Sequence, residues 1–331
     1  MMHEPSSRTY TWYSTVPGFF LQDDPTTDSE GFDFTTANFG LISREYDTDP
    51  SFDPERKKTQ WQRFEDKVSS LNQESGDKVQ YKVLFMGRHG EGYHNVAESF
   101  YGTKAWDCYW SLKDGNDEMT WADAHLTPAG IEQALKAHAF WASLLADQYI
   151  PAPESYYTSP LTRCLDTANH TFSGLALPKD RPFVPVIKEL FREAIGIHTC
   201  DRRSSKTFIA QRYPDWHFES QFAESDPLWK ADLREGNRAM DERSKAALDS
   251  VFENDQNTWI SISSHSGEIG SLLRGAYYVL NSLRLSFLPF GLGTGQVIPV
   301  LVKAETLDGT APKFSGSPGT TPSACMAPPT S

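Results

Sequence analysis

The sequence has few cysteines and few basic residues for its length. The four cysteines among 331 residues form no Cys-x-x-Cys pair and show no zinc-site spacing, so we expect them to be reduced thiols. There are 31 basic and 44 acidic residues, which give a formal net charge of −13. This excess of acidic charge argues against a general binding surface for nucleic acid or anionic membranes. An anionic ligand would need a positive pocket that is built locally.

Long apolar segments are also absent. No run reaches the about 18 residues that a membrane-spanning helix needs, and residues 1–15 lack the basic start and apolar centre of a signal peptide. We therefore expect no membrane partner and a cytoplasmic location, with the nucleus as an alternative. A hydrophobic fraction of 38% and an aromatic fraction of 13% are sufficient for a large folded core.

Apolar runs and helical periodicities alternate through the middle of the chain. Short apolar runs predict strands at 81–86, 155–159, 183–188, 258–264 and 296–304. Apolar residues at helical spacing predict helices at 57–72, 127–148, 160–173, 236–254 and 266–282. This alternation is typical of a layered α/β/α domain with a mostly parallel central sheet.

Composition divides the chain into three parts. Residues 1–77 are aromatic, acidic and irregular, and we expect them to form an N-terminal extension packed on the core. Residues 78–308 hold the alternating pattern, with cap-like insertions at about 96–125 and 196–235. Residues 309–331 are rich in Pro, Ser, Thr and Gly, so we expect a disordered tail.

Basic side chains directly follow three of the predicted strands. Arg88 and His89 come after the first strand, Arg163 follows the second, and His265 follows the strand at 258–264. Because ligands of such sheets bind outside the carboxyl ends of the strands, we expect these four side chains to lie together. Guanidinium groups grip phosphate oxygens in pairs, and a histidine can attack or donate a proton. The sequence therefore predicts a site for phosphoryl transfer.

The segments around these residues resemble motifs of the histidine phosphatase superfamily, the group that includes cofactor-dependent phosphoglycerate mutase. RHGEGYHN (88–95) resembles its Arg-His-Gly signature. Four further segments resemble, in the expected order, the blocks that follow the signature: LTPAGIEQA (126–134), YTSPLTRCLDTA (157–168), LFREAIG (190–196) and SHSG (264–267). The resemblance covers roughly residues 80–304, and GFFLQDDP and YGTKAWDCYWS are similar to a fungal branch. It implies a phosphoglycerate mutase-like fold.

The resemblance also implies a role for each matching residue. His89 is the nucleophile that becomes phosphohistidine, and Glu193 is the general acid that protonates the leaving oxygen. The phosphoryl oxygens are bound by Arg88, Asn95, Arg163 and His265. No metal and no cofactor are implied, because guanidinium groups supply the positive charge.

Several of these assignments have alternatives. Glu189, four residues before Glu193, competes for the acid role, although only Glu193 fits the Glu-x-x-Gly pattern. Asn95 could instead cap the helix that follows it. His94 is expected to face solvent or a neighbouring side chain. The basic residues of the second insertion that could contact the rest of a substrate are Arg202, Arg203 and Lys206.

Three functions are compatible with these residues. The leading interpretation is a phosphomonoesterase that acts on a small phosphorylated compound. A mutase would use the same residues, but Gly92 stands where the family's mutases commonly carry a small hydroxyl residue, and the Pro-rich tail does not resemble a mutase lid. A protein that only binds phosphate is the third interpretation, and the intact set of two histidines and two arginines argues against it.

Overall fold

The computed structural model describes residues 8–24, 26–29, 31–275, 291–321 and 324–327. The strands are β1 (Thr9–Thr15), β2 (Val79–Arg88), β3 (Ser155–Thr158), β4 (Val186–Ile187), β5 (His217–Phe218), β6 (Trp259–Ser264) and β7 (Val297–Asp308). The helices are α1 (Asp49–Phe52), α2 (Gln60–Glu74), α3 (Tyr93–Tyr101), α4 (Thr103–Cys108), α5 (Pro128–Ser143), α6 (Thr162–Phe172), α7 (Lys206–Arg212), α8 (Asn237–Asn254) and α9 (Ser266–Gly275). The last part of the predicted helix 266–282, from 276 on, lies outside the described residues.

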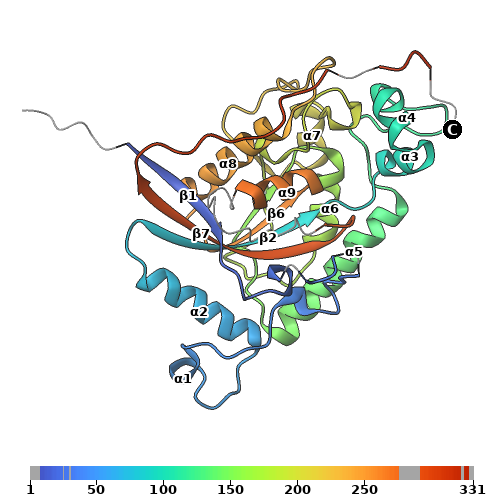
Figure 1. Ribbon diagram of the computed structural model, residues 1–331. Coiled ribbons are helices and arrows are strands. Elements are labelled where there is room, and N and C mark those ends of the chain that lie inside the picture. Colours follow the sequence, from blue (N-terminus) through green and yellow to red (C-terminus); the bar gives the residue numbers. More distant parts are fainter. Residues whose placement is uncertain (1–7, 25, 30, 276–290, 322–323, 328–331) are drawn as a thin grey trace, which may run out of the picture.

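The described strands form one sheet in the order β1-β7-β2-β6-β3-β4-β5 (Figure 1). Strands β2, β6, β3, β4 and β5 run parallel to one another, whereas β7 is antiparallel to both β2 and β1. The predicted layered α/β fold with a mostly parallel sheet is confirmed.

Side-chain alternation along β2 gives the sheet two buried faces. Val83 and Phe85 pack in a core cluster with the apolar residues of α2 and α5. Leu84 and Met86 point the other way and pack with α8 and α9. Because a parallel strand is covered on both faces, β2 reads as a continuous apolar run in the sequence.

Two edge strands were not expected from the sequence. β1, from the N-terminal extension, pairs with β7 over the register Thr9↔Asp308 to Thr15↔Val302. β5 belongs to the 196–235 insertion and pairs with β4, so this insertion extends the sheet as well as covering it. A strand of only two residues is too short to produce a periodicity, which is why β5 leaves no signal.

The C-terminal tail also differs from the expectation. Thr320 and Arg234 exchange two backbone hydrogen bonds of 2.9 Å, so this part of the tail is attached to the end of the 196–235 insertion. Further on, Cys325 forms a disulfide with Cys108 at the end of α4. The expectation of four reduced thiols is therefore wrong for this pair, because a partner 217 positions away gives no local pattern. Cys164 and Cys200 are free and buried.

None of the helices in the described part of the chain combines the length and the apolar character that crossing a membrane requires.

Candidate active site

The two sequence-predicted histidines meet where β2 and β6 end side by side. Arg88, the last residue of β2, is in register with Ser264, the last residue of β6. His89 and His265 each follow directly, and the backbone N–H of His89 donates to the Ser264 carbonyl over 3.0 Å. The two imidazole rings are 5.1 Å apart between centroids, in an edge-to-face arrangement. The sheet register therefore places both histidines at one point.

The contacts of His89 favour the tautomer that a nucleophilic histidine needs. Its side chain is buried, and Nδ1 lies 2.7 Å from the carbonyl oxygen of Gly90. Because a carbonyl oxygen only accepts, we assign the proton to Nδ1, which leaves the lone pair of Nε2 free. Burial, and then the charges of Arg163 and Arg88, lowers the pKa of His89 well below its usual value. The imidazole is therefore neutral at physiological pH.

Two guanidinium groups lie near His89, and each has one N–H group without a hydrogen-bond acceptor. Arg163, in the first turn of α6, is buried and donates to the Cys200 carbonyl and to Asp201 over 2.6 and 2.8 Å. Arg88 donates to the carbonyl of Leu292 over 2.6 Å. The Nε atoms of both arginines are buried without a hydrogen-bond partner. Buried donors are normally satisfied, so these two N–H groups are available to a bound anion.

Ion pairs fix the orientation of Arg163. Although burial opposes it, the charges of Arg234 and Arg163 lower the pKa of Asp201 to about 2. Asp201 therefore stays ionised and pairs with Arg163 at 2.8 Å and with Arg234 at 2.9 Å. His198, Cys200 and Asp201 also place potential metal-ligand atoms within 4.8 Å of one another. The two arginines beside Asp201 oppose a further cation, so we assign no metal to this group.

His265 is fully buried and oriented by a hydroxyl group. Its Nε2 lies 2.9 Å from Ser159 Oγ and 3.3 Å from Cys164 Sγ. Burial, followed by the charge of Arg163, lowers its pKa well below the usual value. Burial also raises the pKa of the Cys164 thiol, which keeps Cys164 protonated beside the histidine.

Glu193 lies next to the block that carries His265. One of its carboxylate oxygens accepts the backbone N–H of Gly267 over 3.0 Å, and the other accepts the N–H of Ala194 over 3.0 Å. A Cβ on Gly267 would lie 2.1 Å from Glu193 Oε1, so only glycine allows this approach. The competing residue, Glu189, is instead held by Arg203 and Arg192.

Arg243 of α8 holds the segment that carries Glu193, and no sequence pattern indicates this role. Its guanidinium donates to backbone carbonyls over 2.8, 2.9 and 3.2 Å, those of Leu190, Arg192 and Glu193. It also pairs with Glu235 at 2.8 Å and with Glu268 at 3.0 Å. Burial raises the pKa of Glu268 to about 8 despite this contact.

The remaining sequence-predicted residues make contacts with other parts of the protein. Asn95 Oδ1 accepts the N–H of Gly92 over 3.0 Å, as in the capping alternative. All five N–H groups of Arg203 donate to protein acceptors, which leaves none for a substrate. Arg202 pairs with Asp114 and lies 5.1 Å from the Trp229 ring, and Lys206 lies 5.2 Å from the Phe218 ring.

His94 was expected to face solvent or a neighbour, and its neighbour is the nucleophile. Its ring centroid is 5.3 Å from that of His89, and its Nδ1 is buried without a partner. The available sequence signal was its position in the first turn of a helix that begins just after the Arg-His-Gly motif.

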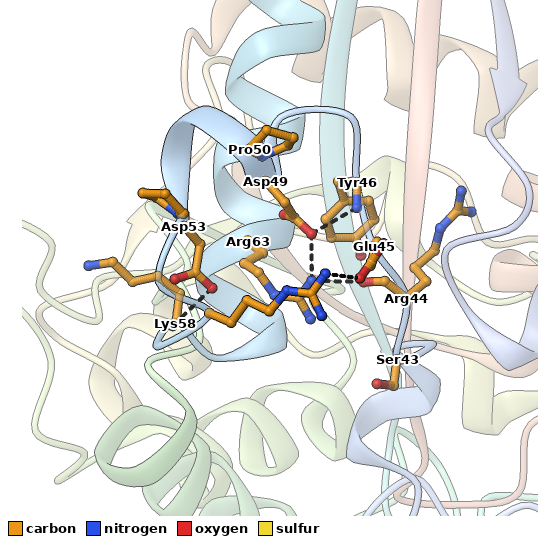
Figure 2. Close-up of a pocket in the computed structure, with 11 residues that line it drawn as sticks. Ser43, Arg44, Glu45, Tyr46, Asp49, Pro50, Asp53, Lys58 and Arg63 are labelled. Carbon is orange, nitrogen blue, oxygen red and sulfur yellow. Dashed lines mark hydrogen bonds and ion pairs between the residues drawn. The ribbon is translucent and has the colours of Figure 1, made fainter.

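A separate cavity of about 680 Å³ lies beside α1 and α2 (Figure 2). Its charged side chains pair with one another, as in Arg63–Asp49 at 2.7 Å and Arg56–Glu45 at 2.9 Å. We therefore assign no ligand to it.

Comparisons with known proteins agree with the motifs. The model of the histidine phosphatase superfamily (branch 1) matches residues 110–286, which include Arg163, Glu193 and His265. A probable phosphoglycerate mutase of Arthroderma benhamiae is 51% identical over 294 residues, which cover 89% of this chain and 85% of that protein. Phosphomutase-like protein 3 of Candida albicans is 33% identical over 294 residues and covers 88% of this chain and 80% of that protein.

Two further comparisons are more distant. A probable phosphoglycerate mutase of Saccharomyces cerevisiae is 33% identical over 241 residues, or 67% of this chain and 79% of that protein. Among solved structures, the α-ribazole phosphatase from Shigella flexneri matches with 21% identity and a TM-score of 0.39, over 66% of this chain and 94% of that chain. The assignment rests on the family model and the fungal relatives: the chain belongs to the histidine phosphatase superfamily, in its phosphoglycerate mutase-like branch.

Proposed function

We propose that this protein is a metal-independent phosphomonoesterase that acts on a small phosphorylated substrate through a phosphohistidine intermediate. The observation that carries the proposal is a neutral His89 with a free Nε2, beside two guanidinium groups that each keep a buried, unpartnered N–H. A neutral imidazole can attack phosphorus, and the two guanidinium groups can bind the non-bridging oxygens of the phosphoryl group.

In the first step His89 Nε2 attacks phosphorus in line, and the bond from phosphorus to the leaving oxygen breaks. Arg88 and Arg163 neutralise the charge on the non-bridging oxygens, and the neutral imidazole of His265 can add a hydrogen bond to them. Glu193, in its acid form, gives its proton to the leaving oxygen. Its position beside Gly267, two residues after His265, supports this role.

In the second step water attacks the phosphorus of phosphohistidine. Glu193, now a carboxylate, takes the proton of the attacking water, and the bond between phosphorus and Nε2 breaks. Inorganic phosphate is released, and His89 returns to its neutral state. The same residues serve both halves of the reaction.

Phosphoglycerate mutase activity is the second candidate, and the names of the fungal relatives favour it. A mutase transfers the phosphoryl group from phosphohistidine to a second hydroxyl of the substrate instead of water. The same residues around phosphorus would serve, so the fate of the phosphoenzyme separates the two activities.

The test is a phosphate-release screen over sugar phosphates, nucleotides, inositol phosphates and phosphoglycerates. We expect activity in the wild type, none in His89→Ala, and unchanged activity in His217→Ala, which removes an exposed imidazole of β5. Equal activity in the wild type and His89→Ala would refute the proposal.

A second assay examines phosphoglycerate conversion after priming with 2,3-bisphosphoglycerate. Isomerisation that is faster than phosphate release would show that the protein is a mutase and not a phosphatase. Tight phosphate binding without turnover of any compound would indicate a binding protein.

A further inference from the structure

His94 occupies a protected position against the nucleophile. It is the second residue of α3, whose N-cap is Gly92, and its ring is tilted by 54° to that of His89. Burial lowers its pKa well below the usual value, and the charges of Arg163, His89 and Arg88 add to this effect. His94 is therefore a neutral imidazole with one N–H donor, placed among the groups that surround the nucleophile.

The ring of His94 explains the glycine at position 92. A Cβ built on Gly92 would lie 2.7 Å from His94 Nδ1 and 2.9 Å from its Cε1. The backbone of Gly92 has φ −105° and ψ 163°, which any residue can adopt. Conformation therefore does not demand glycine here. What excludes a larger side chain is the position of the imidazole.

The Nδ1 atom of His94 is in the same condition as the Nε atoms of Arg88 and Arg163. All three are buried nitrogens without a hydrogen-bond partner. A buried polar atom without a partner costs free energy, so each one calls for an explanation, and a bound ligand is one such explanation. These three nitrogens belong to residues around one nucleophile, and a bound anion would give them an acceptor.

We propose that His94 is a phosphoryl-binding residue, whose Nδ1–H donates a hydrogen bond to a non-bridging oxygen of the group transferred to His89. The inference rests on the proposed function and adds a residue to which the resemblance assigns no role. His94 acts on the phosphoryl group itself, whereas Glu193 acts on the leaving oxygen. Its contribution is therefore the same for every leaving group.

The experiment compares three changes at this contact. His94→Ala removes the donor, His94→Gln retains an N–H donor, and Gly92→Ala displaces the ring without removing it. Gly76→Ala is the matched control, because a Cβ at Gly76 meets nothing within 4 Å. Thermal denaturation of each variant checks that it is folded.

Two readouts separate this role from simple packing. The first is the affinity for orthovanadate and for inorganic phosphate, measured by binding so that no turnover is needed. The second is kcat/KM for p-nitrophenyl phosphate and for an alkyl phosphate. Because a hydrogen bond to a charged group is involved, His94→Ala should weaken vanadate binding and lower both kcat/KM values by about tenfold to a hundredfold.

Gly92→Ala should reproduce most of the loss seen in His94→Ala, and the double variant should lose no more than His94→Ala alone. His94→Gln should recover part of the vanadate affinity. Vanadate affinity and both kcat/KM values within twofold of the wild type in folded His94→Ala would overturn the inference. Losses confined to the alkyl phosphate would also overturn it, because they would place His94 on the leaving group.

Failure of the role of His94 can be distinguished from failure of the proposed phosphatase activity. If the wild type binds vanadate but hydrolyses nothing, the phosphatase proposal fails and the binding comparison still decides the role of His94. If His89→Ala is inactive while His94→Ala equals the wild type, only the role of His94 fails.

Discussion

Replacing Arg243 with Gln should impair the reaction selectively for poor leaving groups. Arg243 does not belong to the set that holds the phosphoryl group. It donates to three backbone carbonyls between Leu190 and Glu193, so it orients the segment that carries the carboxyl of Glu193. Its loss should therefore disturb proton donation and leave attack by His89 intact.

The magnitude follows from the contacts that are lost. The Arg243 side chain is only 8% exposed and pairs with Glu235 and Glu268. Removing one partner of a buried ion pair costs about 3–5 kcal/mol of the free energy of unfolding. Glu268, with a pKa of about 8, is already largely protonated at neutral pH, so removing Arg243 leaves little unpaired charge there, which places the expected cost at the lower end of that range.

General acid catalysis contributes about 10²–10⁴-fold, and a displaced acid loses part of that. For an alkyl phosphate, whose leaving oxygen needs the proton, we expect kcat/KM to fall about tenfold to a hundredfold. For p-nitrophenyl phosphate, whose leaving group departs as an anion, we expect a change below about threefold. Vanadate affinity should stay at the wild-type value.

The matched control is Arg238→Gln, on the same helix, where the exposed arginine pairs with Glu242. This variant should behave as the wild type with both substrates, because surface pairs contribute little to stability. Equal losses for the two substrates in folded Arg243→Gln would refute the reasoning, since they would show a general distortion of the site and not a misplaced acid.

Three further outcomes are expected. Gly267→Ala puts a Cβ 2.1 Å from Glu193 Oε1, so it should lower kcat/KM for alkyl phosphates at least tenfold, and an unchanged rate would contradict the assigned approach. Glu268 has a pKa raised by burial from 4.5 to about 8, so the folded state holds an extra proton between these values and the free energy of unfolding falls as pH rises from 5 to 8. Urea denaturation of Glu268→Gln should show a flatter pH dependence over that range than the wild type. Cys325→Ser removes the disulfide to Cys108 and should lower the free energy of unfolding by about 2–4 kcal/mol without reductant. The wild type treated with reductant should match Cys325→Ser, and a persistent difference would argue against the bond.

The parts of the site that the sequence predicts are those fixed by sheet geometry. His89 and His265 are far apart in the chain, yet each follows a parallel strand, and adjacent parallel strands bring their carboxyl ends together. Arg163 comes slightly later, in the first turn of the helix that follows β3. For the two histidines, recognising a strand and the residue after it was sufficient.

The parts that were missed depend on contacts that leave no local pattern. Arg243 is one of two arginines on α8, and only its contacts with 190–193 distinguish it from Arg238. His94 looks like an ordinary helix residue until the ring is seen beside His89. The Cys108–Cys325 bond joins two segments that show neither spacing nor composition in common.

The position of β7 imposes an order on folding during synthesis. β1 pairs with β7 alone, and β2 depends on β7 for one of its two neighbours. Of the described strands, the ribosome makes β1 first and β7 last, so β1 has no strand partner until β7 has been synthesised. A nascent chain stalled before residue 297 would leave both β1 and one edge of β2 open to other chains, and it is at this stage that chaperone protection matters most.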